Sequence, residues 1–130
     1  MSSFDQPRQR QVPLHFSGTI NGSPVIQVLS EKTLVVAIKP NCDGCRDFVH
    51  STLDELAHVE VLVVSESADG ATEWANGHQN VLIAPGILSE LGIKWPPFFV
   101  LIDPASSMII TEGVVFGPSQ IAKEIAPFLI

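Results

Sequence analysis

The only two cysteines of the chain, Cys42 and Cys45, are separated by two residues, a spacing that suits thiol–disulfide chemistry. Residues 33–38 ahead of the pair form an apolar run of strand length, and residues 46–58 after it show helical periodicity. At the start of a helix, unpaired N–H groups and the positive end of the helix dipole stabilise a thiolate on the first cysteine. The second cysteine lies within one turn, close enough to form a disulfide. The motif therefore predicts a redox pair with Cys42 as the nucleophile and Cys45 as the resolving cysteine.

Length and composition indicate that the pair has a chemical role more than a structural one. The chain has 130 residues, of which 45% are hydrophobic and 16% charged, as expected for one globular domain that can bury a core without disulfide bonds. Two cysteines are too few for a disulfide scaffold. A bond between Cys42 and Cys45 closes so small a loop that it stabilises the fold only slightly.

The net charge of −7 is concentrated around the cysteines. Residues 41–80 contain one basic side chain, Arg46, while the rest of the chain is neutral. The acidic side chains in this segment are Asp43, Asp47, Asp54, Glu55, Glu60, Glu66, Asp69 and Glu73. Such a distribution argues against nucleic acid and anionic membranes as partners.

Targeting signals are not evident in the sequence. No segment approaches the ~18–20 apolar residues of a membrane span, and the N-terminus lacks the apolar stretch of a secretory signal. We therefore expect a cytoplasmic protein, or an exported one if the sequence is a fragment of a longer chain. Residues 1–11 are polar and are expected to form a disordered arm, and residues 12–130 a single domain.

Apolar periodicity predicts the elements that must position the cysteines. Strands are expected at 12–16 continuing to 19–20, and at 25–29, 33–38, 60–65, 81–83, 98–102 and 108–116. Helices are expected at 46–58, at 69–75 with Asp69 as the N-cap, at 85–91, and from Pro118 onward. Strands separated by helices imply parallel pairing, and the tight turn after Asp103 implies an antiparallel hairpin. The pattern predicts a layered α/β domain with an N-terminal hairpin.

A second segment strengthens the interpretation of the cysteine pair. Residues 92–103, Gly-Ile-Lys-Trp-Pro-Pro-Phe-Phe-Val-Leu-Ile-Asp, resemble the part of thioredoxin-like proteins in which a cis-proline precedes a central strand. By position Pro97 matches that proline and Pro96 the residue before it. In the family this proline faces the cysteines, and the backbone beside it contacts the substrate. Trp95 is either packed in the core or exposed as an aromatic platform for a partner.

The resemblance spans most of residues 25–130, and the layout is most similar to the TlpA-like reductases. It implies a thioredoxin-like three-layer sandwich, with a central mixed sheet flanked by helices and an N-terminal β extension. It also implies a thiol–disulfide oxidoreductase that acts on protein disulfides or dithiols and receives electrons from an upstream donor. No organic cofactor is required, because electrons are transferred by exchange with another dithiol.

The sequence departs from the family at positions expected to tune the site. Asn41 stands where a tryptophan usually precedes the first cysteine, and Asp43-Gly44 where Gly-Pro or a similar pair lies between the cysteines. Val36 stands where many thioredoxins carry a buried aspartate. An acidic side chain beside Cys42 opposes thiolate formation, although an aspartate in the first turn also interacts favourably with the helix dipole.

Other functions remain open at this stage. The cysteines could be vestigial in a non-catalytic binding module, part of a redox-sensing module, or half of a metal site. Zinc normally needs four ligands, and the sequence contains no second C-x-x-C. His50, Asp54 and His58 would lie on one face of a helix over 46–58, but this face is expected to be a solvated surface. We therefore expect no metal site.

Overall fold

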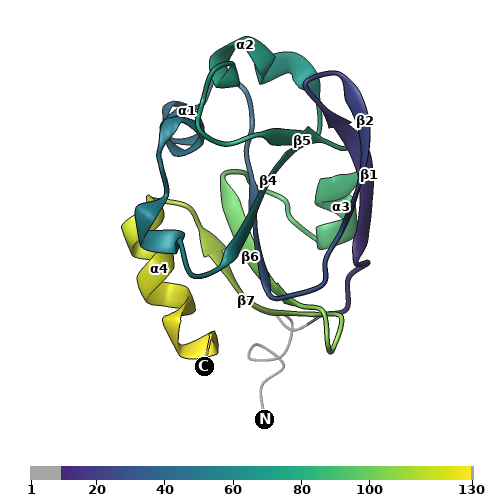
Figure 1. Ribbon diagram of the computed structural model, residues 1–130, viewed down its shortest axis with the longest axis vertical. Helices are drawn as coiled ribbons and strands as arrows, with labels where there is room; N and C mark the ends of the chain where they lie inside the picture. The colour runs from purple at the N-terminus through teal and green to yellow at the C-terminus, as the bar shows by residue number, and fades with distance from the viewer. Residues whose placement is uncertain (1–9, 130) are drawn as a thin grey trace.

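The computed structural model, which describes residues 10–129, contains a mixed seven-stranded sheet in the order β2-β1-β5-β4-β3-β6-β7 (Figure 1). The strands are β1 His15–Ile20, β2 Ser23–Val28, β3 Thr33–Ala37, β4 Glu60–Ser65, β5 Val81–Ile83, β6 Phe98–Asp103 and β7 Met108–Val114. Every residue of β3 is buried, as its continuous apolar run predicts for a central strand. The predicted N-terminal hairpin is β1–β2, which pairs antiparallel and joins the sheet through β5.

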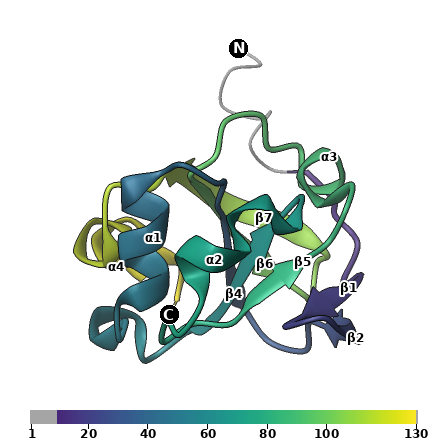
Figure 2. The ribbon, with the colours of Figure 1, turned by 90° about the horizontal axis from the view of Figure 1, so that it is seen from above.

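Helices cover both faces of the sheet. They are α1 Asp43–His50, α2 Ala71–Trp74, α3 Ile87–Leu91 and α4 Pro118–Ile125, with short 3-10 helices η2 Asp54–Leu56, η3 Ala68–Gly70 and η4 Ala126–Phe128. Seen from above, α1 and α4 lie on one side of the sheet and α3 on the other (Figure 2). The arrangement is the three-layer sandwich that the sequence predicts.

Successive side chains of β3 point to opposite faces of the sheet, so the strand contributes to the core on both faces. Val35 and Ala37 pack in the cluster that contains Ile87 of α3. Leu34 and Val36 pack in the opposite cluster, which contains Phe48 of α1 and Ile121 of α4. The strand that leads to the cysteines is thus fixed from both sides.

The prediction that strands separated by helices pair in parallel is only partly correct. β3 pairs parallel with β4, and β4 with β5. β6 follows α3 but pairs antiparallel with β3, with Ala37 opposite Phe98. After α3 the chain does not complete a crossover in the same direction. It enters the sheet on the far side of β3 and runs back along it, a long-range choice that local periodicity does not encode.

The helix predicted at 46–58 is shorter and begins earlier. It ends at His50, and Leu53 takes a left-handed conformation (φ 56°) before η2 begins. Apolar residues on both sides of the break are buried, so the hydrophobic spacing continues although the helix does not. The predicted N-cap Asp69 is also wrong, because Ser67 Oγ accepts the hydrogen bond from the Asp69 N–H at 3.4 Å.

Part of the predicted N-terminal arm is held against the domain. Residues 1–9 lie outside the described residues. Gln11 forms a β-bridge with Met108. Arg10 forms an ion pair with Glu112 at 2.9 Å and donates to the carbonyl of Leu91. Arg10 and Gln11 are thus packed against the domain.

Candidate functional site

Cys42 and Cys45 form a disulfide at the start of α1, directly after the loop that leaves β3. Cys42 is the N-cap residue of the helix, and its Sγ accepts a hydrogen bond from the Cys45 N–H at 3.2 Å. The helix therefore directs the Cys45 N–H and the positive end of its dipole toward Cys42 Sγ. Cys42 is half-buried, while Cys45 is fully buried in the core below the helix. The first sulfur can be approached from solvent and the second cannot.

Pro96 and Pro97 lie at the same edge of the sheet as the cysteines. Their peptide bond is cis, as the resemblance to thioredoxin-like proteins implies for this segment. Because Phe98 at the start of β6 pairs with Ala37 at the end of β3, the residues just before β6 and just after β3 are neighbours across the strands. The register therefore brings the Pro96–Pro97 segment to the side of the loop that carries Cys42.

Trp95, just before the two prolines, is 79% exposed, so the core-packing alternative for this residue is wrong. Phe116 is 83% exposed in the loop that follows β7. The two loops are joined by a hydrogen bond from the Val115 N–H to the Pro97 carbonyl at 3.2 Å. Two aromatic side chains thus lie on solvent-facing loops that flank the prolines.

A cavity of about 290 Å³ lies between α1 and the loop after β7. Its lining comprises Gly44, Asp47, Phe48, Ser51, Val115, Phe116, Gly117 and Pro118. Gly44 belongs to the cysteine motif, so the cavity reaches the segment between the two cysteines. Phe116 was expected only to end the last strand, and no sequence signal marked it as a site residue.

Glu73 of α2 reaches the loop in front of the disulfide. Both of its carboxylate oxygens accept from the Asn41 N–H, at 2.9 and 3.2 Å. Asn41 has a left-handed backbone conformation (φ 57°). The sequence gives no indication of this contact, because the two residues are 32 positions apart and belong to different elements.

The other predicted tuning positions have simpler surroundings. Asp43 is in the first turn of α1 and forms an ion pair with Arg46 at 2.9 Å, with its side chain 88% exposed. Gly44 has open space where a Cβ would be. Val36, at the position of the family's buried aspartate, is fully buried among apolar side chains.

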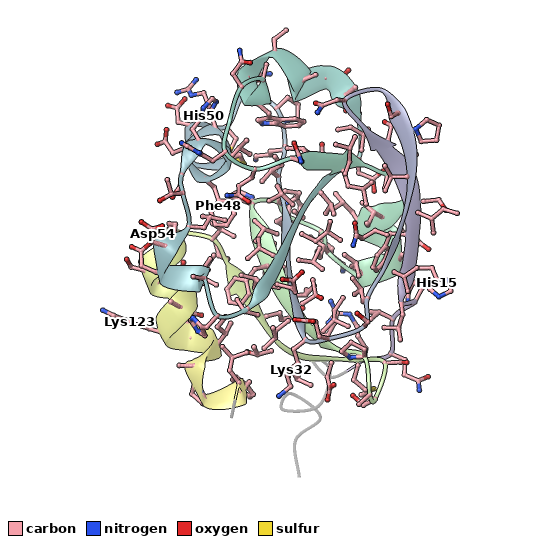
Figure 3. All side chains as sticks on the ribbon, viewed as in Figure 1. His15, Lys32, Phe48, His50, Asp54 and Lys123 are labelled. Carbon is pink, nitrogen blue, oxygen red and sulfur yellow. A yellow bond between two sulfur atoms is a disulfide. The ribbon has the colours of Figure 1, made fainter. Side chains whose placement is uncertain are left out.

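The column expected for His50, Asp54 and His58 does not form, because α1 ends at His50. His50 Nε2 instead lies 3.1 Å from the Glu73 carbonyl oxygen. Figure 3 shows His50 and Asp54 on different segments, and His15 on the opposite side of the molecule. Within residues 10–129, no three His, Cys, Asp or Glu side chains are grouped to hold a metal ion.

The helices of the structure are short. Among the helices in the described part of the chain, none is both long and apolar enough to cross a bilayer.

Comparison with solved structures identifies the architecture. The thioredoxin domain of a thiol-disulfide oxidoreductase from Bacteroides vulgatus superposes with a TM-score of 0.68, at 17% identity over 92% of this chain and 96% of that one. A secreted Mycobacterium tuberculosis disulfide oxidoreductase homologous to Escherichia coli DsbE gives 0.59, at 17% identity over 88% and 96%. Mycobacterium tuberculosis DsbF, solved in mixed oxidized and reduced forms, gives 0.65, at 18% identity over 92% and 100%.

No protein-family model matches the chain, and the search of curated proteins found no match. The likeness to the solved structures is therefore a likeness of fold. It confirms the sequence-based prediction of a thioredoxin-like sandwich.

Proposed function

We propose that this thioredoxin-like domain is a thiol–disulfide oxidoreductase that exchanges disulfides with protein partners through Cys42 and Cys45. One observation carries the proposal. The two cysteines are bonded to each other, with the accessible one capping a helix and the other buried one turn inside. A structural disulfide gains little from so short a loop. A redox pair needs this asymmetry between an attacking and a resolving sulfur.

The exchange proceeds in two balanced displacements. The Cys42 thiolate attacks one sulfur of a partner disulfide, which forms a mixed disulfide and releases the other partner sulfur as a thiolate. Cys45 then loses its proton and attacks Cys42 Sγ, which re-forms the Cys42–Cys45 bond and releases the second partner sulfur. The partner gains two electrons and the protein loses two. An upstream dithiol returns them by the reverse displacements.

The surface beside Cys42 suits a polypeptide partner. Pro96 and Pro97 have no N–H groups, and the Pro97 carbonyl already accepts from Val115. A partner strand beside this segment can therefore donate to the Pro96 carbonyl but receives no hydrogen bond from either proline. Exposed Trp95 and Phe116 add apolar contact area on both sides of the prolines. The negative charge of the 41–80 segment favours partners with neutral or basic docking faces.

The compartment sets the direction of electron flow. In a cytoplasm, where thiols are kept reduced, the pair would act as a reductant, whereas an oxidising compartment supports either direction depending on the electron donor. A cytoplasmic location remains a sequence-based prediction.

A non-catalytic docking module is the second candidate. The exposed aromatic side chains Trp95 and Phe116 favour it, because a docking face needs apolar area whether or not the cysteines react. A redox-sensing module would use the same surface, with the disulfide controlling whether the partner binds.

Trapping of the mixed disulfide distinguishes these candidates. In Cys45→Ser the second displacement cannot occur, so covalent complexes that dithiothreitol releases are expected to accumulate with partner proteins in cell extract.

Alkylation of the reduced wild-type protein is expected to modify Cys42 before Cys45, because only Cys42 is accessible.

Cys42→Ser is the matched control, since it keeps Cys45 but removes the attacking sulfur, and it is expected to trap nothing. Preferential labelling of Cys45 would contradict the assignment of the nucleophile. A Cys45→Ser protein that traps no partner, together with full biological activity of the double serine variant, would favour the docking module.

A further inference from the structure

The contact between Glu73 and Asn41 joins α2 to the loop that carries the attacking cysteine. The Asn41 N–H donates to both oxygens of the Glu73 carboxylate, and Asn41 directly precedes Cys42. Glu73 is half-buried and belongs to α2, which packs into the core through Trp74, a residue that is 5% exposed. The carboxylate thus comes from a packed element and not from a free surface side chain.

Asn41 needs this support because of its backbone conformation. Its φ of 57° lies in the left-handed region, which L-residues other than glycine rarely adopt, although asparagine tolerates it better than most. The left-handed turn aims the Asn41 N–H toward α2 and lets the chain leave β3 and enter α1 at Cys42. The Glu73 carboxylate therefore holds the loop in the form that places the first cysteine.

The carboxylate also brings a charge near the residue that carries the reacting sulfur. The hydrogen bond of 2.9 Å and standard bond lengths put it within about 8 Å of the Cys42 Cα. Among the other charged groups near the start of α1, Asp43 and Arg46 neutralise each other in an ion pair. His50 contacts the Glu73 carbonyl and not its carboxylate. Lys39, two residues before Asn41, and Asp47 of α1 are also charged, but among the described residues Glu73 is the carboxylate that is hydrogen-bonded to this loop.

We infer that Glu73 is a positioning residue that sets the redox properties of Cys42 through Asn41, an inference that rests on the proposed exchange function. Its negative charge destabilises the Cys42 thiolate and so raises the pKa of this thiol, against the effect of the helix dipole. Reduction of the Cys42–Cys45 disulfide takes two electrons and two protons, and ionisation of Cys42 then stabilises the reduced form. A group that opposes this ionisation makes the pair a stronger reductant.

Replacement of Glu73 by Gln separates charge from position. Gln retains an oxygen that can accept from the Asn41 N–H, so the loop is kept while the charge is removed. From the Coulomb interaction over this distance, we expect the acid dissociation constant of Cys42 to rise by about three- to tenfold. At a pH above the Cys42 pKa, the equilibrium with glutathione should shift toward the reduced protein by a similar factor, and a tenfold change corresponds to about 30 mV.

The two quantities are measured separately. The Cys42 pKa comes from the pH dependence of iodoacetamide alkylation in the Cys45→Ser background, where only one thiol titrates. The redox equilibrium comes from the fraction oxidised in glutathione buffers, with both cysteines present.

Glu66→Gln is the matched control. The Glu66 carboxylate also accepts two backbone N–H groups, but from Gly86 and Leu88 at the start of α3 and not from the loop before Cys42, so its replacement should shift both quantities less.

The outcomes distinguish the inference from the proposed function. A wild-type pair that does not cycle with glutathione would refute the exchange function, while the alkylation experiment would still test Glu73. A cycling wild-type pair with an unchanged Glu73→Gln variant, or an equal shift in Glu66→Gln, would overturn the inference. If Glu73→Gln does not fold, the comparison is made in an Asn41→Gly background, because glycine adopts the left-handed conformation without support.

Discussion

Cys42 and Cys45 are joined covalently but have different surroundings, and this difference gives each a separate role. Cys42 caps α1 and is partly accessible, whereas Cys45 faces the core with no exposed surface. The two residues between them also have different surroundings. Asp43 forms an ion pair with Arg46, whereas no heavy atom lies within 4 Å of a Cβ built at Gly44. Reactivity here depends on the backbone position of each residue as much as on its chemical type.

Gly44 tests this dependence on the backbone. It lies inside the first turn of α1, its φ is not positive, and no heavy atom lies within 4 Å of a Cβ built there. Gly44→Ala is therefore expected to raise the free energy of unfolding by about 0.4–1 kcal/mol, because alanine loses less backbone entropy on folding. Urea denaturation of the reduced protein measures this change.

Gly22 is the matched control for Gly44. It also has open space around the missing Cβ, but its φ is 82°. Gly22→Ala should lower the free energy of unfolding by about 1 kcal/mol, since the left-handed conformation is strained for alanine. The same sign for both substitutions would contradict the argument from backbone conformation.

The elements around the site are held together by contacts that link one to another. α1 ends early at His50, and the chain continues through η2, which packs against α4. The Ser119 hydroxyl of α4 donates to the Glu55 carboxylate of η2 at 2.8 Å. This hydrogen bond, together with one from the Glu55 backbone, lowers the pKa of Glu55 below its ordinary value.

Ser119→Ala is expected to raise the pKa of Glu55 toward its ordinary value, as measured by NMR titration of the side-chain carboxyl. A lowered native pKa stabilises the fold above the unfolded-state pKa, and this stabilisation is lost as the pH falls through the native pKa. The variant should therefore lose less stability on acidification than the wild type. Ser119→Thr retains the hydroxyl and serves as the control, and an unchanged Glu55 pKa in Ser119→Ala would contradict the assignment.

In the molecule as a whole, three segments far apart in sequence converge at one edge of the sheet. They are the loop after β3 with the cysteines, the Pro96–Pro97 segment before β6, and the loop after β7 with Phe116. Pairing of β6 with both β3 and β7 brings them together. This edge thus carries the half-buried Cys42, the exposed Trp95 and Phe116, and a small cavity lined in part by Gly44 and Phe116.

If this edge binds protein partners, Trp95→Ala and Phe116→Ala should lower kcat/KM for a protein disulfide by about 10-fold or more each, because a buried aromatic contact contributes a few kcal/mol of binding. The rate with oxidised glutathione, which is too small to cover both loops, should change little. Stopped-flow assays whose signal does not depend on tryptophan fluorescence measure the rate with each substrate.

Ile26→Ala is the matched control for the aromatic substitutions. Ile26 is 69% exposed on the edge strand β2, at the end of the sheet away from β3 and β6. Its substitution should affect neither substrate. Equal losses with the protein disulfide and with glutathione in Trp95→Ala or Phe116→Ala would indicate a defect in the cysteines and not in partner docking.

The sequence by itself determined the features that depend on neighbouring residues. The apolar run of β3, the place of Cys42 near the start of a helix and the proline pair before β6 follow from local composition and spacing, and the structure contains all three. The resemblance to the thioredoxin-like family added the relation between the cysteines and Pro97, which local patterns do not contain.

Only the tertiary structure decided which distant residues meet. The antiparallel entry of β6, the end of α1 at His50, the exposure of Trp95 and the contact of Glu73 with Asn41 each depend on packing between segments far apart in the chain. Hydrophobic spacing continues past His50 whether the backbone is helical or not, so the sequence pattern could not locate the break. A glutamate that accepts a loop N–H also has the same local sequence signature as one exposed to solvent, and the fold alone distinguishes them.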